Sequence, residues 1–366
     1  MENMKYLSRL SHLVHARFIW LLLGSYVVAA FFPELGLSIR SLSWGSISLP
    51  MIMLGFLLFN AGLGVELSAL RKLKQDPLPL AWGLSANLCI PICYIACVML
   101  TMQLWHNPDE VQHILVGLAL VASMPIAGSS TAWSQNSNGN MAISLGMVLF
   151  STFLSPLATP LALHTVGFMT TGDYSEDLHE LAGSQTGWFL LIAVILPSAL
   201  GILCHQLMGK ERVKARKANL KLFNSAILLL LNYSNASVSL PQAIANPDYD
   251  FLAVTLVITS LLCAIAFFAG WVISRLKHTD KADQIALMFG LGMNNNGTGL
   301  VLASMALADH PGVLLPIIFY NLVQHLIAGT VDHLMFCGPG NDGSAKESET
   351  GSPSRFFQQA PQKGAG

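Results

Sequence analysis

The stretch Gly290-Leu-Gly-Met-Asn-Asn-Asn-Gly-Thr-Gly299 places three consecutive amides among four glycines in the middle of an apolar segment. A second stretch of this kind begins at Pro125 and reads Pro-Ile-Ala-Gly-Ser-Ser-Thr-Ala-Trp-Ser-Gln-Asn-Ser-Asn-Gly-Asn, ending at Asn140. Irregular backbone is tolerated inside a bilayer only where it is buried in protein or lines a cavity. We therefore expect both stretches to interrupt membrane-spanning helices, and these interruptions decide the fold.

The composition around these stretches is typical of a membrane protein. Only 11% of the 366 residues are charged, whereas 53% are hydrophobic. A soluble domain carries roughly 25% charged residues, so a soluble enzyme and a disordered chain are both excluded. The formal net charge of -1 offers no basic surface for nucleic acid. What remains is an all-α polytopic protein whose main partner is the lipid bilayer.

A membrane-spanning helix needs about 20 mostly apolar residues. Scanning the chain for such runs predicts ten spans, and the two interrupted stretches fall in the fourth and the ninth. The predicted ranges are 18–36, 47–68, 78–103, 112–136, 141–165, 187–208, 219–241, 251–274, 283–308 and 312–336.

The charged residues orient these spans. All of the 19 lysines and arginines except Arg40 fall on one side of the predicted topology. Because cytoplasmic loops hold the positive charge, we expect both termini in the cytoplasm, in a plasma or bacterial inner membrane. The opposite loops carry acids instead: Asp109, Glu110, Asp173, Glu176, Asp177, Glu180, Asp248, Asp250 and Asp309.

The predicted spans divide into two halves of five, 18–165 and 187–337, flanked by an N-terminal segment 1–17 and a disordered tail 338–366. Because five is odd, the second half has inverted topology. Interrupted spans at matching positions of inverted repeats indicate a transporter binding site. Half-helix N-termini there favour an anion, and freed carbonyls favour a cation. The alternative is that both stretches are only tightly packed, glycine-rich helices.

Four motifs then carry a resemblance to a known family. They are Ser123-Met-Pro-Ile-Ala-Gly-Ser-Ser-Thr131, Gly139-Asn-Met-Ala-Ile-Ser144, Gly292-Met-Asn-Asn295 and Val323-Gln-His-Leu-Ile-Ala-Gly329. In this order and spacing the chain resembles the bile acid:sodium symporter family over roughly residues 18–337.

The resemblance implies a core domain (spans 3–5 and 8–10), a panel domain (spans 1, 2, 6 and 7) and two broken helices that cross. It also implies alternating access of an organic anion coupled to sodium, without any other cofactor. Carried over by position, the sodium-binding residues are Ser130, Thr131, Ser144, Leu291, Met293 and Asn294. The substrate-facing residues are Ser129, Asn295, Asn296 and His325.

Departures from the family pattern concern the sodium ligands. Gly290 stands where the family has an acid shared by two ion sites, and Val148 stands where a further hydroxyl is usual. Sodium is a hard cation that accepts neutral oxygen ligands, but an uncompensated charge in a low-dielectric site costs several kcal/mol. No acid lies in the middle of a predicted span. We therefore expect sodium coupling to be weakened or altered, with at most one ion neutralised by the substrate's own charge.

Three other functions compete with a symporter. A sodium-independent facilitator and a non-cycling sensor or receptor for an organic anion would both keep the binding site. An intramembrane enzyme would need a deep catalytic acid, a nucleophile–base pair or a metal cluster, and the sequence shows none. His325 lies in the middle of a span, where it fits a cavity-lining side chain better than a proton-coupling group.

Overall fold

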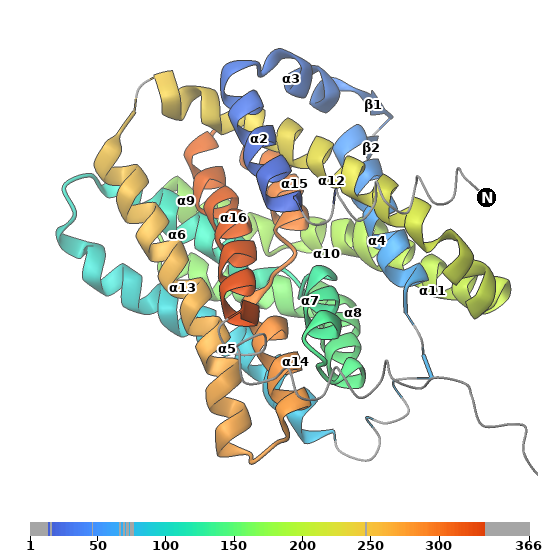
Figure 1. The fold of residues 1–366 in the computed structure, drawn as a ribbon. Helices are drawn as coiled ribbons and strands as arrows, with labels where there is room; N and C mark the ends of the chain where they lie inside the picture. The colour runs from blue at the N-terminus through green and yellow to red at the C-terminus, as the bar shows by residue number, and fades with distance from the viewer. Residues whose placement is uncertain are drawn as a thin grey trace, which may run out of the picture.

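The described part of the chain is almost entirely helical in a computed structural model (Figure 1). The expected cytoplasmic segment 1–17 and the expected tail 338–366 lie outside the described residues, apart from two positions at the start. The described residues are 14, 17–45, 47–65, 67, 68, 70, 73, 77–245 and 247–333.

The helices follow one another with short connections. The first part of the chain contains α2 (Phe18–Phe31), α3 (Glu34–Ser41), β1 (Ser43–Trp44), β2 (Ile47–Ser48), α4 (Leu49–Leu63), α5 (Leu78–Thr101), the 3-10 helix η2 (Met102–Leu104), α6 (Pro108–Ser123), α7 (Ser129–Asn136), α8 (Met141–Gly167) and α9 (Asp173–Leu181). The second part contains α10 (Ser184–Leu190), the π-helical turn η3 (Leu191–Ile195), α11 (Leu196–Met208), α12 (Lys210–Ala245), α13 (Tyr249–Leu276), α14 (Lys281–Gly292), α15 (Asn296–Ala306), the 3-10 helix η4 (Pro311–Val313) and α16 (Leu314–Val331).

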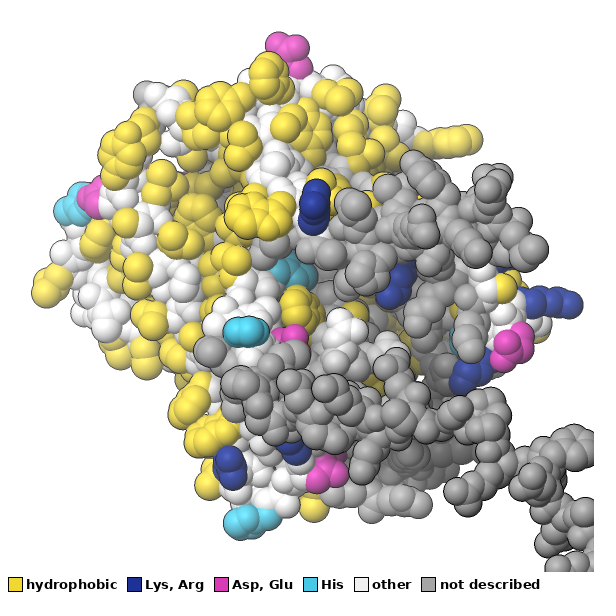
Figure 2. All heavy atoms as spheres, in the orientation of Figure 1, with side chains coloured by type: hydrophobic (Ala, Val, Ile, Leu, Met, Phe, Trp, Pro, Cys, Tyr) yellow, Lys and Arg dark blue, Asp and Glu magenta, His cyan; other side chains and the backbone are white. Residues whose placement is uncertain are grey.

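Among the described residues, five helical segments are long and apolar enough to cross a membrane, or six if the bent pair α2 and α3 counts as one. Hydrophobic side chains cover much of the described surface in Figure 2, and the charged side chains there are few. The five segments are Leu78–Leu104, Met141–Gly167, Thr186–Met208, Tyr249–Leu276 and Pro311–Val331.

The first helix ends earlier than the predicted range 18–36. Helix α2 stops at Phe31, and the chain bends by 92° before α3. Pro33 explains the bend, because a proline disfavours helical geometry in the preceding residue and Phe32 lies outside the helical region (φ -132°, ψ 66°). The segment 34–41 is therefore a separate short helix rather than the end of a span.

Helix α12 begins earlier than the predicted range 219–241. It starts at Lys210, so that the basic segment after α11 is helical and only Gly209 separates the two helices. Gly209 has φ +79°, a positive value that glycine adopts without steric cost. Lysine and arginine are good helix formers, which explains why the basic segment continues the helix.

The helices pack in two groups. Helices α2, α3, α4 and α11 surround α12 or its neighbours, whereas α5, α6, α8, α14 and α16 pack with one another and with α13. Figure 1 shows α4 and α11 side by side at one edge of the molecule and α5, α6 and α13 toward the other. Helix α15 contacts both groups, since it packs on α12 and α4 as well as on α16 and α6.

Candidate functional site

The two interrupted stretches meet and hydrogen-bond to each other. Helix α6 ends before Met124 and α7 begins at Ser129, while α14 ends before Met293 and α15 begins at Asn296. Ile126 and Asn294 form an antiparallel bridge between the breaks. The Ala127 amide donates to the Met293 carbonyl at 2.9 Å, and the Asn295 amide donates to the Pro125 carbonyl at 2.8 Å. Residues almost 170 positions apart in the sequence therefore provide hydrogen-bond partners for each other's backbone N–H and C=O groups.

The pairing places two helix N-termini at one point. Helices α7 and α15 both start directly after their break. The first amides of a helix lack intrahelical acceptors, and the helix dipole is positive at that end. The positive ends of two helix dipoles therefore lie at this meeting point of the breaks, called the crossing below. Asp, Glu, Lys and Arg are absent from both connecting segments, 124–128 and 293–295.

Asn294 is the junction of the crossing. Its amide N–H donates to Oε1 of Gln324 at 3.0 Å, and its Nδ2 donates to the Val121 carbonyl at 3.1 Å. Its Oδ1 is buried and has no hydrogen-bond partner among the described residues. An unpaired buried carbonyl oxygen costs about 1–3 kcal/mol. Oδ1 of Asn294 is therefore suited to a cation or to a hydrogen-bond donor.

The other predicted sodium-binding residues differ in whether their oxygens already take part in hydrogen bonds. The hydroxyls of Ser130 and Ser144 are buried and lack a partner in the described part of the chain. The Thr131 hydroxyl donates to the Gly128 carbonyl at 2.7 Å, and the Met293 carbonyl accepts from Ala127 as above. Ser130, Ser144 and Asn294 thus keep oxygens for a cation, whereas Thr131 is used within its own helix turn.

An apolar cluster fills the space beside Gly290. Leu291, the remaining predicted residue, belongs to this cluster together with Met147 of α8. A Cβ added at Gly290 would lie 2.7 Å from Cε and 2.8 Å from Sδ of Met147. The same thioether borders Gly83 of α5, at 2.9 Å from a Cβ added there. The space beside Gly290 is therefore occupied by a fully buried methionine.

The predicted substrate-facing residues also differ in their surroundings. Asn296 is buried, and neither of its side-chain polar atoms has a partner in the described structure. Asn295 instead caps α15, since its Oδ1 accepts from the Thr298 amide at 3.3 Å. Ser129 is half-buried at the start of α7. His325 lies edge-on against Phe18 of α2, with ring centroids 6.1 Å apart.

A chain of buried polar side chains, which sequence reasoning missed, leads away from the crossing. Gln324 accepts from Asn294, and its Nε2 donates to Oδ1 of Asn321 at 3.3 Å. Nδ2 of Asn321 donates to Oδ1 of Asn232 on α12 at 3.1 Å and to the Tyr26 hydroxyl on α2 at 2.8 Å. Two amides three residues apart in the apolar α16 were the signal that could have revealed this chain.

Further unpaired amides lie on the helices that face the crossing. Asn60 of α4 has two buried polar atoms without a partner in the described chain, and Asn235 of α12 has its Nδ2 in the same state. Ala61 approaches the first break, 3.6 Å from a Cβ added at Gly128. Leu231 approaches the start of α15, 4.0 Å from a Cβ added at Gly297. Helices α4 and α12 therefore border the crossing opposite α5 and α8.

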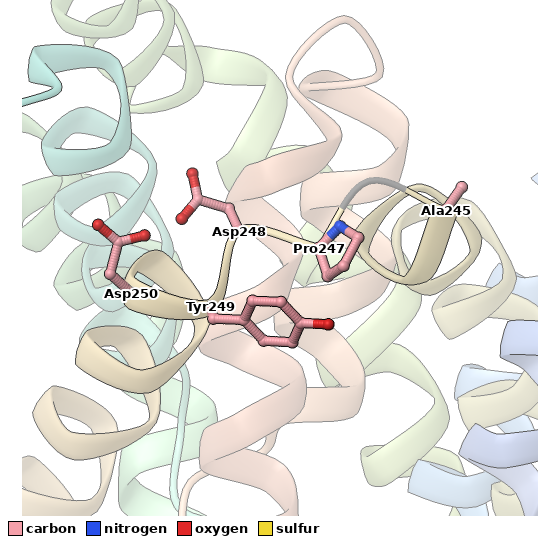
Figure 3. A pocket seen from close by; sticks show the side chains of 5 residues that line it. All are labelled: Ala245, Pro247, Asp248, Tyr249 and Asp250. Carbon is pink, nitrogen blue, oxygen red and sulfur yellow. The ribbon is translucent and has the colours of Figure 1, made fainter.

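Two hollows in the described part of the chain are lined in part by polar side chains. A cavity of about 250 Å³ lies between α5, the first break and α8, and Asn87, Ser123, Pro125, Ser151 and Ser155 contribute to its wall. A wide, open hollow of about 720 Å³ lies where α12 passes into α13 (Figure 3). Its carboxylates have structural roles: Asp248 caps α13, and Asp250 lies 3.4 Å from His106.

A separate titratable cluster lies on the acid-rich face, away from the crossing. His310 lies 3.5 Å from Asp177 of α9, and the Tyr174 hydroxyl lies 3.1 Å from Nε2 of His113. Partial burial raises the pKa of Asp177, and the neighbouring His310 acts against that shift. These contacts tie α9 to α6 and to the connection before η4, so this cluster has a structural role.

Apolar helices interrupted at two places, with the breaks paired, define a class of membrane transporters. The model of the SBF-like CPA transporter family (DUF4137) matches residues 16–335 of the chain. The chain therefore belongs to this family, and it is an integral membrane transport protein rather than an enzyme. This confirms the resemblance to bile acid:sodium symporters drawn from the motifs.

Curated relatives are distant but cover most of the chain. An uncharacterized protein, YbaS, of Bacillus subtilis is 23% identical over 285 residues, which are 76% of this chain and 86% of the relative. YocS of the same organism, named as an uncharacterized sodium-dependent transporter, is 25% identical over 77% of this chain and 81% of its own. A probable sodium/metabolite cotransporter of Oryza sativa, BASS2, is 23% identical over 78% of this chain and 62% of its own.

Proposed function

We propose that the protein is a secondary transporter that moves an organic anion across the membrane by alternating access. The observation that carries the proposal is the pair of hydrogen-bonded helix breaks, surrounded by buried hydroxyls and amides that have no partner among the described residues. Polar groups are costly in a membrane interior unless they serve a ligand or a pathway. Two converging helix N-termini select a negatively charged ligand.

The architecture of the proposal is ten spans in two inverted repeats, 18–165 and 187–337. Helices α5 to α8 and α13 to α16 form the moving core, and α2, α4 and α10 to α12 form the panel. The segments 1–17 and 338–366 are cytoplasmic. The grouping of α2, α4, α11 and α12 by contact supports this division, whereas α10 packs on α8. The location of α4 and α12 beside the crossing supports it as well.

In this proposal the anion binds between the panel and the crossing. The amides of Asn60, Asn235 and Asn296 have buried, unpaired polar atoms that suit the oxygens of a carboxylate or sulfonate. Ser129 and Asn295 line the same space at the starts of α7 and α15. His325 borders the panel at Phe18, where it lines the cavity without taking part in proton coupling.

The sodium part of the proposal rests on two opposing observations. The names of the relatives include sodium dependence, and Ser130, Ser144 and Asn294 hold unpaired buried oxygens of the kind that sodium prefers. Met147, however, fills the space beside Gly290, and the countercharge for a second ion is missing. We infer that at most one sodium ion accompanies the anion and that coupling is weak. A sodium-independent facilitator is the second candidate. It is favoured by the same observation, that Met147 fills the space beside Gly290.

Transport by purified protein in liposomes tests this function. Vesicles loaded with unlabelled taurocholate, propionate or benzenesulfonate are exposed to the labelled form of the same anion, with sodium or potassium on both sides. We expect counterflow of at least one anion, with a rate that changes by less than about tenfold when sodium replaces potassium.

The alternative functions give different results. Steep, cooperative sodium dependence with two ions per anion would contradict weakened coupling. Complete indifference to sodium would identify a facilitator. An anion that raises the melting temperature of the purified protein but shows no counterflow would identify a sensor. The control is Ser144→Ala, which should weaken any sodium effect and leave sodium-free counterflow unchanged.

A further inference from the structure

Arg40 is the one lysine or arginine that falls in the acid-rich loops of the predicted topology. An organic anion that approaches this face meets many carboxylates, which repel it, and a single guanidinium. We propose that Arg40 is the anion-recognition residue at the mouth of the pathway on this face and that it orients Asn235 toward the anion. This inference rests on the proposed function and extends it to a residue that the family pattern did not assign.

The position of Arg40 is defined by close packing of α3 on α12. The Tyr233 hydroxyl of α12 donates to the Phe32 carbonyl at 2.6 Å and accepts from the Gly36 amide at 3.2 Å. A Cβ added at Gly36 would collide with the Ser237 side chain. The bend at Phe32 and Pro33 thus turns α3 onto α12, and its last turn carries Arg40 toward α15.

Arg40 spans the boundary between the two groups of helices. Its Nη2 donates to the carbonyl of Ser304, near the end of α15, at 2.8 Å. Its Nη1 lies 3.5 Å from Oδ1 of Asn235 on α12. These contacts use two of the five guanidinium donors, so donors remain for a carboxylate or sulfonate. In the proposed function the two helix groups move past each other, and the contact with Ser304 is the one that an arriving anion would replace.

The contact with Asn235 fixes the direction of a buried amide. In an asparagine side chain only Oδ1 accepts hydrogen bonds. The arginine that donates to this oxygen therefore fixes the orientation of the amide, with Nδ2 directed away from Arg40. Asn235 is completely buried, and its Nδ2 has no partner within the described structure. An amide donor held in a buried interface and backed by a positive charge suits an anion. Arg40 and Asn235 therefore form one anion site with an outer and an inner part.

Transport kinetics in oriented membrane vesicles test this inference. The probes are taurocholate, propionate and benzenesulfonate, measured in right-side-out and inside-out vesicles for the wild type, Arg40→Gln, Arg40→Lys and Asn235→Leu. We expect Arg40→Gln to raise KM about tenfold in right-side-out vesicles, as expected for one lost charge-assisted pair, and to change it less than about twofold in inside-out vesicles. Arg40→Lys should recover part of the loss. Asn235→Leu should raise KM from both sides.

The matched control is Arg275→Gln, because Arg275 lies over the Trp271 ring on the opposite, basic side of the topology. It should leave KM unchanged in both vesicle orientations. If Arg40→Gln lowers the maximal rate from both sides at unchanged KM, Arg40 is only a structural contact and the inference is wrong. If all variants and the wild type transport anions equally, the inference fails while the function stands. If the wild type transports none of the probes, the proposed function fails and the inference fails with it.

Discussion

At the scale of the residue, the contact between Gly290 and Met147 is the basis of the proposal that sodium coupling is weak. The thioether lies between Gly83 and Gly290 in a buried apolar cluster. A glutamate at 290 would have to displace it and would bring an unpaired carboxylate into that cluster. We predict that Gly290→Glu lowers the free energy of unfolding by about 3 kcal/mol, measured by thermal unfolding in detergent.

The double variant Gly290→Glu/Met147→Ala separates volume from charge. Removing the thioether makes room for the carboxylate, so the double variant should recover part of the lost stability. The added negative charge should also make its melting temperature rise when sodium replaces potassium. Met147→Ala alone is the control and should show no such sodium response. If Gly290→Glu is as stable as the wild type, the space beside Gly290 is open and the explanation is wrong.

Sequence reasoning found the crossing but not every side chain in it. The breaks stood out because glycines and amides interrupt apolar runs, and the structure pairs these very stretches. The role of Met147 was not visible, because it depends on how α8 is rotated against α14. Gln324 was missed for a similar reason. Consecutive residues of a helix point about 100° apart, so Gln324 meets Asn294 while His325 meets Phe18.

At the scale of the element, reciprocal glycines hold α4 against α11. A Cβ added at Gly62 would collide with the Ser198 carbonyl, and one added at Gly201 would collide with the Phe59 carbonyl. Small residues permit such close approach of helices in membranes. Since backbone cannot yield as a flexible side chain does, we predict that Gly201→Ala lowers the free energy of unfolding by about 1–3 kcal/mol.

The matched control is Gly24→Ala in α2, because a Cβ added there meets nothing within 4 Å. Alanine is favoured over glycine inside a helix by roughly 0.5–1 kcal/mol, so Gly24→Ala should be neutral or stabilising. Thermal unfolding of both variants in the same detergent makes the comparison. Equal stability of the two variants would contradict close packing of α4 on α11.

Element boundaries were predictable only where composition changes sharply. Both ends of α13 and the start of α16 lie within two residues of the predicted ranges 251–274 and 312–336. The predicted end at 336 lies outside the described residues. The first helix was drawn too long, since an apolar window continues across Phe32 and Pro33 although the backbone turns by 92° there. The start of α12 was predicted too late. The charged residues before it were expected to form a loop, but the lysines and arginines there are helical.

At the scale of the whole molecule, buried amides connect the crossing to the opposite group of helices. The chain runs from Asn294 through Gln324 and Asn321 to Asn232 and Tyr26. In the proposed mechanism these two groups move past each other, so the last links must break and re-form in each cycle. Networks of this kind hold a particular arrangement because a partly satisfied network is costly. We therefore predict that the chain of amides couples occupancy at the crossing to the relative position of the helix groups.

Gln324→Met tests this coupling, because methionine has nearly the volume of glutamine. Methionine lacks the amide oxygen that accepts from Asn294 and the amide nitrogen that donates to Asn321. The unsatisfied partners should lower the free energy of unfolding by about 1–3 kcal/mol. Anion binding by the purified protein should persist, since Asn296 and the helix N-termini are untouched, whereas counterflow should slow by about tenfold. The exposed Gln206 of α11 supplies the control, and Gln206→Met should change neither quantity. Counterflow at the wild-type rate in Gln324→Met would show that the helix groups move independently of the amide chain.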